Sequence, residues 1–274
     1  MTDRRPRKSL GQCFLTNRRV AEKIVALAEA GPGDRVVEIG PGRGILTRLL
    51  ADRAGELVAV ELDPRWHADL KAEFAHATHV RVVLADALTY PFEAIAPPFT
   101  VVANLPYYIS TPILFRLLDL RARISRMVLM LQREVVDRLL AKPGTKSYGA
   151  LSVAVAYRAE VRKGFPVAPG SFSPRPAVES AVVVITPRPA PAIAVRSEET
   201  LFRVIRAAFA HRRKVLANAL RDEGFDGRLL VPFNANRVGG ALEAAEIEPK
   251  RRGETLTLEE FGRLADALGV ERHQ

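Results

Sequence analysis

Four consecutive residues, Asn104 to Tyr107, combine groups that could align a weakly nucleophilic amine for a transfer reaction. The amine of an adenine base is of this kind: its lone pair is delocalised into the ring, so it needs orientation more than a strong base. The Asn104 side-chain oxygen and the Leu105 carbonyl could accept its two N–H bonds, and Pro106 would fix the turn. Tyr107 would offer a ring on which the base stacks. A capped helix start with aromatic packing would also explain Asn104 and Pro106, but not their place in a ligand-binding sheet.

A glycine-rich turn, GPGRG, follows the apolar run RVVEI. Glycines at the mouth of a strand let the backbone approach a ligand closely. Gly40, Gly42 and Gly44 give the spacing G-x-G-x-G, and Ile45 stands where a dinucleotide fingerprint has its last glycine. This spacing disfavours a pyrophosphate and fits S-adenosylmethionine, in which a sulfonium amino acid replaces the phosphates. A ligand-free strand–helix turn would have a similar sequence, so the motif is not specific by itself.

Acidic residues end the next two apolar runs. Glu61 follows the glycine turn by about 20 residues, where a carboxylate can accept hydrogen bonds from both ribose hydroxyls. Asp86 could bind the adenine amine, and Ala87 offers a backbone N–H. A single acid at a strand end is commonly a helix N-cap. Ligand groups at three successive strand ends instead predict an S-adenosylmethionine site that contains Gly40, Gly42, Glu61, Asp86 and Ala87.

The elements that must position these residues alternate along the first half of the chain. Apolar runs typical of buried strands lie at residues 34–40, 55–63, 79–88, 99–104 and 125–132. Helical patterns between them indicate βαβ units and an α/β fold with a parallel sheet covered on both faces. Residues 149–161 and 179–187 have no helical pattern between them and are predicted as strands at an antiparallel edge of this sheet.

A change of composition divides the chain. Residues 186–197 contain three prolines and are typical of a semi-rigid linker. Amphipathic helices are predicted after it, at residues 198–220, 239–247 and 257–269. We therefore predict a cofactor-binding catalytic domain with a basic N-terminal arm at residues 1–188, and a helical C-terminal domain that binds RNA or the ribosome at residues 189–274.

The charge balance favours a polyanionic partner. The chain has 274 residues, a net charge of +10 and a pI near 10.1. Lys and Arg cluster at residues 1–23, 121–146 and 203–214, which favours nucleic acid over a merely solvated surface. No apolar run approaches the roughly 18 residues of a membrane span, and no secretory signal is recognisable. We expect a cytoplasmic protein with no membrane partner.

Neither cysteine nor histidine chemistry is expected. Cys13 is the single cysteine, which excludes a disulfide framework and a cysteine-based metal site and suits a reducing compartment. His76 and His79 have a ligand-like spacing, but no acid or cysteine cluster joins them, so no metal is predicted. Cys13 has no histidine nearby in the sequence to activate it as a nucleophile, and a methyl transfer here should be direct.

Longer motifs give the sequence a family resemblance over nearly the whole chain. The segments KSLGQCFL, EIGPGRGILT, VELD, ADAL, NLPYYIST, KPGTKSYGALSV, FSPRPAVESAVV and AFAHRRKVLANAL occur in this order. They resemble the motifs of the ribosomal RNA adenine N6-dimethyltransferases of the KsgA/RsmA type. The resemblance implies a Rossmann-like class I S-adenosylmethionine-dependent methyltransferase sheet with a small helical C-terminal domain.

The resemblance also implies roles for individual residues. Cofactor contacts would come from Cys13, Leu15, Gly40, Glu61, Asp86 and Asn104. Phe172 would stack on the target base opposite Tyr107, although it could instead anchor its loop. The family usually has Asn at the position of Cys13, so a polar contact near the cofactor would be lost or taken over by the backbone. It usually has Thr at the position of Val215, where a methyl group replaces the hydroxyl.

The function implied is dimethylation of N6 on two adjacent adenines in a 3′-terminal hairpin loop of small-subunit (16S) ribosomal RNA. S-Adenosylmethionine would be the cofactor, and the enzyme would act as a monomer on a pre-30S particle, in a family linked to kasugamycin sensitivity. Two alternatives stay open. One is the related large-subunit enzyme that confers macrolide resistance, whose motif usually begins N-I-P. The other is an RNA-binding assembly factor that keeps the fold without needing catalysis.

Overall fold

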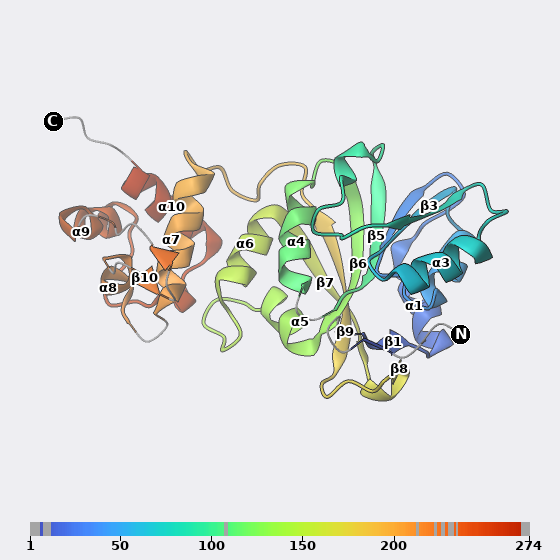
Figure 1. Cartoon of the computed structure of the whole chain (residues 1–274). Helices are drawn as coiled ribbons and strands as arrows, with labels where there is room; N and C mark the ends of the chain where they lie inside the picture. Colours follow the sequence, from blue (N-terminus) through green and yellow to red (C-terminus); the bar gives the residue numbers. More distant parts are fainter. Residues whose placement is uncertain are drawn as a thin grey trace. The chain divides into compact units, whose positions relative to one another are not determined.

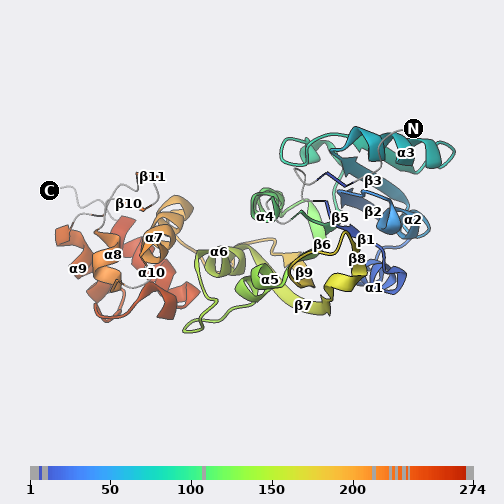
Figure 2. The same cartoon turned by 60° about the horizontal axis from the view of Figure 1, so that its bottom comes forward.

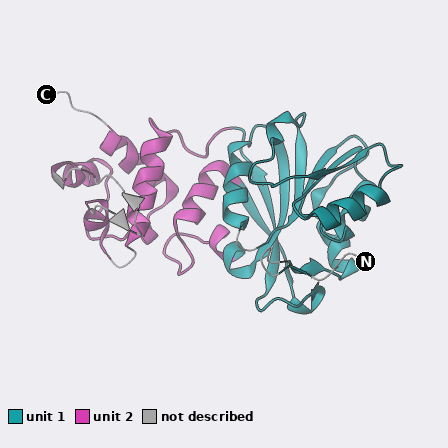
Figure 3. Cartoon of the chain, viewed as in Figure 1, with its two compact units in different colours: residues 1–136, 160–189 teal, residues 137–159, 190–274 magenta. Residues whose placement is uncertain are grey.

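The chain forms two compact units in a computed structural model that describes residues 6–7, 12–106, 109–211, 214–221, 224–225, 228–229, 233 and 235–269. Unit 1 comprises residues 1–136 and 160–189, and unit 2 comprises residues 137–159 and 190–274 (Figure 3). No helix among the described residues is both long enough and apolar enough to cross a membrane.

Unit 1 is built on a twisted sheet that, in the described part of the chain, has seven strands (Figures 1 and 2). Its strands are β2 (Arg35–Ile39), β3 (Glu56–Glu61), β4 (Val80–Leu84), β5 (Phe99–Asn104), β6 (Ile124–Gln132), β7 (Ala159–Val167) and β9 (Ser180–Pro187). Strands β2 to β6 run parallel, and β9 pairs antiparallel with β6. These pairings confirm the five predicted parallel strands and the antiparallel edge at residues 179–187.

Helices follow most of the strands as the alternating pattern predicts, but between β4 and β5, where the pattern predicts a helix, the structure has only a three-residue 3-10 helix, Phe92–Ala94. In unit 1 the α-helices are α1 (Arg18–Ala28), α2 (Ile45–Ala51), α3 (Pro64–Glu73) and α4 (Ser110–Asp119), and α5 (Arg133–Leu139) begins there. Helix α1 begins where Asn17 caps it, since the Asn17 side chain accepts the Val20 N–H at 3.3 Å. Helices α1 and α2 pack on one face of the sheet through fully buried side chains such as Ile24 and Leu50 against Val36.

The strand order places a crevice at the carboxyl ends of β2 and β5. The order is β4-β3-β2-β5-β6-β9-β7, so the chain winds outward from β2 in one direction and from β5 in the other. Adjacent parallel strands whose connections diverge leave a gap beyond their carboxyl ends, and ligands of doubly wound folds bind there. The glycine turn after β2 and Asn104 at the end of β5 both lie at this point.

A small second sheet joins distant segments of unit 1. Strand β1 (Phe14–Leu15) pairs antiparallel with β8 (Phe172–Ser173), and Leu15 lies opposite Phe172. Thr16 extends this pairing, because its backbone N–H donates to the Ser171 carbonyl at 2.8 Å. The pairing brings the N-terminal motif and the FSPRP segment to the same side of the fold.

The prediction of a strand over residues 149–161 is wrong for most of its length. Residues Ala150–Arg158 form helix α6, and strand β7 begins only at Ala159. Leu151, Val153, Val155 and Tyr157 alternate as in a strand, but Ser152 and Ala154 between them are buried as well. Because α6 buries nearly all of its faces, its sequence lacks the polar stripe that would have revealed a helix.

Unit 2 is helical, as predicted, but the segment 198–220, predicted as one helix, contains two separate helices. Besides α6 the unit contains α7 (Glu198–Ala210), α8 (Leu216–Leu220), α9 (Ala235–Ala244) and α10 (Leu258–Gly269), with short strands β10 (Gly224–Phe225) and β11 (Arg228–Leu229). Val153 and Tyr157 of α6 share a buried core with Leu201, Val204 and Phe261. Residues 137–159 therefore group with the C-terminal helices, whereas the predicted division lay wholly at residues 188 and 189. Whether the chain folds as two independent domains divided at residues 188 and 189 stays a prediction.

We expect Tyr148→Phe to destabilise unit 2 by about 1 kcal/mol without affecting unit 1. The buried Tyr148 hydroxyl donates to the Leu256 carbonyl at 2.8 Å, and the substitution leaves that carbonyl without this donor. Urea unfolding, followed by hydrogen exchange in peptides from each unit, measures the effect. Equal loss of protection in peptides of β2 and β5 would contradict the grouping of residues 137–159 with unit 2.

Candidate active site

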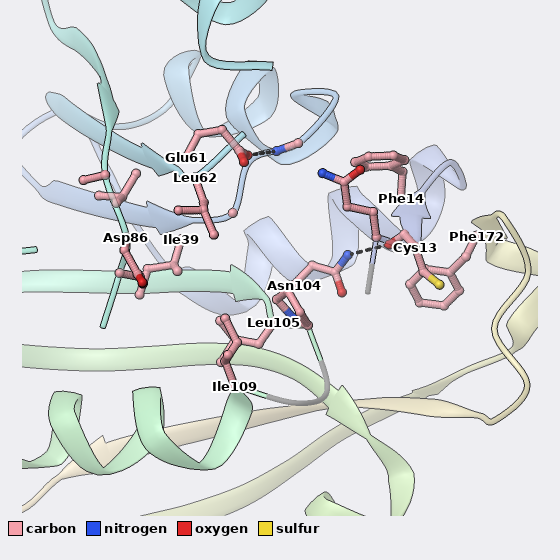
Figure 4. Close-up of a pocket in the computed structure, with 17 residues that line it drawn as sticks. Cys13, Phe14, Ile39, Glu61, Leu62, Asp86, Asn104, Leu105, Ile109 and Phe172 are labelled. Carbon is pink, nitrogen blue, oxygen red and sulfur yellow. Dashed lines mark hydrogen bonds between the residues drawn. The ribbon is translucent and has the colours of Figure 1, made fainter. Parts of the chain in front are cut away.

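A cavity lies at the carboxyl ends of the parallel strands of unit 1 (Figure 4). Ten of the predicted site residues line it: Cys13, Gly40, Gly42, Glu61, Asp86, Ala87, Asn104, Leu105, Pro106 and Phe172. Residues separated by up to 159 positions thus meet in one place, because β1–β8 pairing and the sheet topology bring their segments together.

Of the two other predicted residues, Leu15 is described and does not line the cavity. Leu15 is buried in the core with Ile24 and Val182, and any contact it makes with a ligand stays a prediction. Tyr107 lies outside the described residues, as does Tyr108. The predicted stacking role of Tyr107 therefore also stays a prediction.

The Glu61 carboxylate is held by the backbone on both of its oxygens. Oε2 accepts the Gly42 N–H and Oε1 accepts the Asp63 N–H, each at 2.8 Å. Glu61 is 5% exposed, and this burial raises the pKa of its carboxyl group, while the backbone N–H groups of Asp63, Gly42 and Leu62 oppose the rise. Each oxygen still has a lone pair for a further donor, so the carboxylate can accept both hydroxyls of a vicinal diol.

The glycine turn needs glycine at two positions for different reasons. Gly40 has φ +69° and its N–H donates to the Val60 carbonyl at 2.9 Å. Gly42 has φ +53°, and a Cβ there would lie 2.8 Å from the Phe14 ring. A side chain at Gly42 would therefore be strained in the backbone and would collide with the N-terminal segment.

The end of the cavity that contains Asp86 suits a flat heterocycle with an exocyclic amine. Asp86 follows β4, and its Oδ1 accepts the Leu88 N–H at 2.8 Å, which orients the carboxylate. Leu62 is 43% exposed although it is a large apolar residue, and it lines the cavity together with Ile39 (Figure 4). An apolar surface beside an oriented acceptor matches the needs of an adenine ring.

Asn104 and Leu105 present oxygen acceptors at the end of β5. The Asn104 Nδ2 donates to the Cys13 carbonyl at 3.3 Å, which leaves Oδ1 as the acceptor of that amide. The Leu105 N–H donates to the Met130 carbonyl at 3.2 Å, and the Ile109 N–H closes a turn onto the Pro106 carbonyl. These bonds hold the N–H of Leu105 and the carbonyl of Pro106, and the predicted role of Pro106 in aiming the acceptors stays a prediction.

Cys13 contributes through its backbone and not as a nucleophile. Burial raises the pKa of its thiol, so the nucleophilic thiolate form is disfavoured. Its carbonyl is the group that contacts Asn104. Among the described residues, no group of three or more His, Cys, Asp or Glu side chains is arranged to hold a metal ion.

Sequence reasoning missed seven residues that line the cavity: Gln12, Phe14, Ile39, Val60, Leu62, Ala85 and Ile109. Six of these are direct neighbours of a predicted residue, so the strand-end argument located the segments but named too few positions in each. Leu62 could have been predicted from the sequence. It directly follows the acid that ends β3, so it lies beyond the strand, where an apolar side chain is not needed for the core. Ile109 had no signal of its own in the sequence.

A second buried acid, Glu38, lies under the glycine turn. It is 1% exposed, and burial raises the pKa of its carboxyl group to about 8, with the negative charge of Glu61 acting in the same direction. Glu38 is therefore protonated at neutral pH. Its Oε2 has no hydrogen-bond partner among the described residues.

The sequence is similar to those of known ribosomal RNA methyltransferases. The sequence model of the family "Ribosomal RNA adenine dimethylase" matches residues 4–263. The chain is 46% identical to "Ribosomal RNA small subunit methyltransferase A" of Moorella thermoacetica, over 96% of this chain and 92% of that protein. It is 47% identical to the protein of the same name from Geobacter sulfurreducens, over 96% of this chain and 95% of that protein.

Two solved structures resemble the whole chain. A dimethyladenosine transferase from Plasmodium falciparum has a TM-score of 0.78 and 25% identity, with 92% of this chain and 95% of that chain covered. The 23S rRNA methyltransferase ErmE has a TM-score of 0.69 and 28% identity, with 93% of this chain and 99% of that chain covered. Both likenesses extend over the sheet and the helical part.

We expect Gly42→Ala to weaken binding of S-adenosylmethionine by roughly tenfold or more, because the new Cβ collides with Phe14 and moves the N–H that Glu61 accepts. Isothermal titration calorimetry with the cofactor measures the change. Gly144→Ala is the matched control: Gly144 has φ +81° and open space around it but lies away from the cavity. Equal losses in the two variants would show that backbone strain, and not the site, causes the effect.

A pH-dependent prediction follows from Glu38. In the native state its carboxyl keeps a proton up to about pH 8, whereas in the unfolded chain it loses the proton near its ordinary pKa of 4.5. This group's contribution to the free energy of unfolding is therefore complete below pH 4.5 and falls as the pH rises to 8. Glu38→Gln should remove that fall, by an amount on the order of a few kcal/mol. Urea unfolding of both proteins at pH 5 and pH 8.5 measures it, and parallel pH profiles would contradict it.

Proposed function

The chain belongs to the ribosomal RNA adenine dimethylase family, and on that basis we propose that it transfers methyl groups from S-adenosylmethionine to N6 of two adjacent adenines. The target is a 3′-terminal hairpin loop of small-subunit (16S) ribosomal RNA. The substrate is a pre-30S particle, on which the protein acts as a cytoplasmic monomer during subunit biogenesis. The product is a pair of N6,N6-dimethyladenosines.

One observation carries the proposal: the amine acceptors and the acid-lined part of the site share one cavity. The Asn104 amide and Leu105 stand at the end of β5, and Glu61 and Asp86 stand at the ends of β3 and β4. In Figure 4, Phe172 and Cys13 lie beyond Asn104 on the side away from Asp86. The cavity therefore extends from the nucleoside-like end to an aromatic end, with Asn104 between them.

The residues present fit S-adenosylmethionine. Glu61 has one lone pair left on each oxygen for the two ribose hydroxyls, and Asp86 with Leu62 suits the adenine ring. At Gly40 an added Cβ would have only the Asn104 carbonyl oxygen near it, at 3.9 Å, so this position leaves room for the amino-acid end of the cofactor. When bound, this cofactor supplies an electrophilic methyl group on a sulfonium.

The protein's own part in the reaction is alignment. Asn104 Oδ1 and the Leu105 carbonyl accept the two N–H groups of the target amine, so its lone pair is held out of the base plane and available to the methyl group. Phe172 is 6% exposed and lines the cavity, where its ring can face an extruded base. The N6 proton leaves to solvent after methylation makes the nitrogen acidic, so no strong base is required in the site.

The charge clusters support the choice of RNA as partner. An unpaired loop base is easier to extrude than a paired one, and the surrounding phosphates need basic groups. Arg43 is exposed beside the glycine turn, and Arg175 is exposed on the loop that carries Phe172. The basic arm belongs to the same proposal, as do Arg212 and Arg213. Arg4, Arg5, Lys8, Arg212 and Arg213 lie outside the described residues.

We expect Asn104→Ala to lower kcat for methyl transfer by roughly a hundredfold or more, because one of the two amine acceptors is lost. The affinity for RNA should change less than threefold, since phosphate contacts supply most of it. Incorporation of labelled methyl groups into small subunits that lack the modification measures the first effect, and filter binding measures the second.

The same assay separates the alternatives. Wild-type protein should methylate small subunits and leave large subunits unlabelled, and mapping should place two dimethyladenosines in one hairpin loop. Labelling of large subunits, or macrolide resistance on expression, would instead support the function of the 23S enzymes that ErmE resembles. Binding of small subunits with no methyl transfer by folded wild-type protein would leave only an assembly-factor role.

A further inference from the structure

The segment Gln12–Phe14 crosses the site and touches both of its halves. It lines the cavity with three successive residues, and it precedes the β1–β8 pairing at Leu15. Its contacts on one side go to the glycine turn and α3, and on the other to Asn104. Figure 4 shows Cys13 and Phe14 next to Asn104, with the dashed bond between the Asn104 amide and the Cys13 carbonyl.

The first anchor of this segment is polar. Gln12 Nε2 donates to Asp63 Oδ2 at 3.0 Å, and Asp63 is fully buried. Arg65 pairs with the same carboxylate at 2.6 Å and holds the pKa of the Asp63 carboxyl well below its usual range. Because Asp63 is ionised and also caps α3, the Gln12 amide is bonded to a charged acceptor that has a fixed position.

The second anchor is aromatic. The Phe14 ring meets the Trp66 ring edge-on, with centroids 5.2 Å apart, and the Arg43 guanidinium lies 4.8 Å from the Phe14 centroid. The absence of a side chain at Gly42 leaves the space that this ring occupies. Arg43 and Trp66 belong to the glycine turn and to α3, so both anchors attach the segment to the cofactor half of the site.

Between the two anchors, the Cys13 carbonyl determines which way the Asn104 amide faces. A carbonyl can only accept a hydrogen bond, so the Asn104 atom opposite it at 3.3 Å must be the nitrogen. The amide oxygen is then the atom available to a target amine. Rotation of the amide by half a turn would present N–H donors to the donor N–H groups of that amine and would leave the Cys13 carbonyl without this partner.

We infer that Gln12–Phe14 is a positioning strap, in which anchors at Asp63 and at the Arg43–Trp66 pair hold the Cys13 carbonyl where it fixes the acceptor orientation of Asn104. This inference rests on the proposed function and adds positioning residues, Gln12 and Phe14, to it. A single neutral hydrogen bond contributes too little free energy to hold both an amide rotamer and a short segment. The two anchors provide the additional interactions that hold the segment in place.

The strap also explains why the side chain at position 13 can be that of Cys. The contact to Asn104 is made by a backbone atom, which every residue type provides. What the reaction requires from this position is therefore the path of the backbone. The residues that determine this path are Gln12 and Phe14, and not the side chain of Cys13.

The experiment compares Gln12→Ala with wild type in two measurements. In cofactor-free protein, NMR follows the two side-chain amide protons of Asn104, identified by their absence in Asn104→Asp. We expect slowed hydrogen exchange of the bonded proton in wild type and roughly tenfold faster exchange in Gln12→Ala. In the methylation assay, we expect kcat to fall roughly tenfold while KM for the RNA stays within twofold.

Two further variants complete the test. Phe14→Leu loses the aromatic anchor and should reproduce both changes, so the strap is still tested if Gln12→Ala does not fold. Arg35→Gln removes an ion pair with Glu56 at the first residue of β2 and should leave both measurements unchanged. Unchanged Asn104 proton exchange in a folded strap variant would overturn the inference, whatever happens to kcat. If wild type transfers no methyl groups, the proposed function fails, and the exchange data still decide about the strap.

Discussion

The Glu61 carboxylate, held between the N–H groups of Gly42 and Asp63, is the interaction on which the rest of the site depends. A buried carboxylate is costly unless it is hydrogen-bonded, so this position requires backbone donors that point inward from two different turns. The glycine turn must adopt positive φ to deliver one donor, and the start of α3 delivers the other. The same two turns carry Arg43, Asp63 and Trp66, to which the N-terminal segment attaches.

Methyl transfer explains why the site combines the end of a central strand with a segment that is distant in the sequence. Methyl transfer to an aromatic amine needs alignment more than proton transfer, so the site requires acceptors whose directions are fixed. The end of β5 supplies the position of Asn104, because β5 is a central strand bonded on both sides. Orientation of its amide comes from the Cys13 carbonyl, which is 91 residues away in the sequence.

Much of the fold could be predicted from local patterns. Short apolar runs bounded by turns located five parallel strands, and the acids and glycines at their ends located the cofactor half of the cavity. The prediction was wrong for Ala150–Arg158, because a helix buried on nearly all sides carries the same alternation of apolar residues as a strand. Only its packing with α7 and α10 in unit 2 distinguishes the two structures.

The sequence by itself determined the class of fold, the order of most of its elements, and the places of Asn104, Leu105 and the two strand-end acids in one cavity. These follow from residue type and from spacing along one strand or turn, which are local properties. Tertiary structure decided that Leu15 turns into the core while Phe14 and Leu62 face the site, and that Gln12 reaches Asp63. Such contacts depend on the register of β1 with β8 and on the path of a segment across the sheet, which no local pattern encodes.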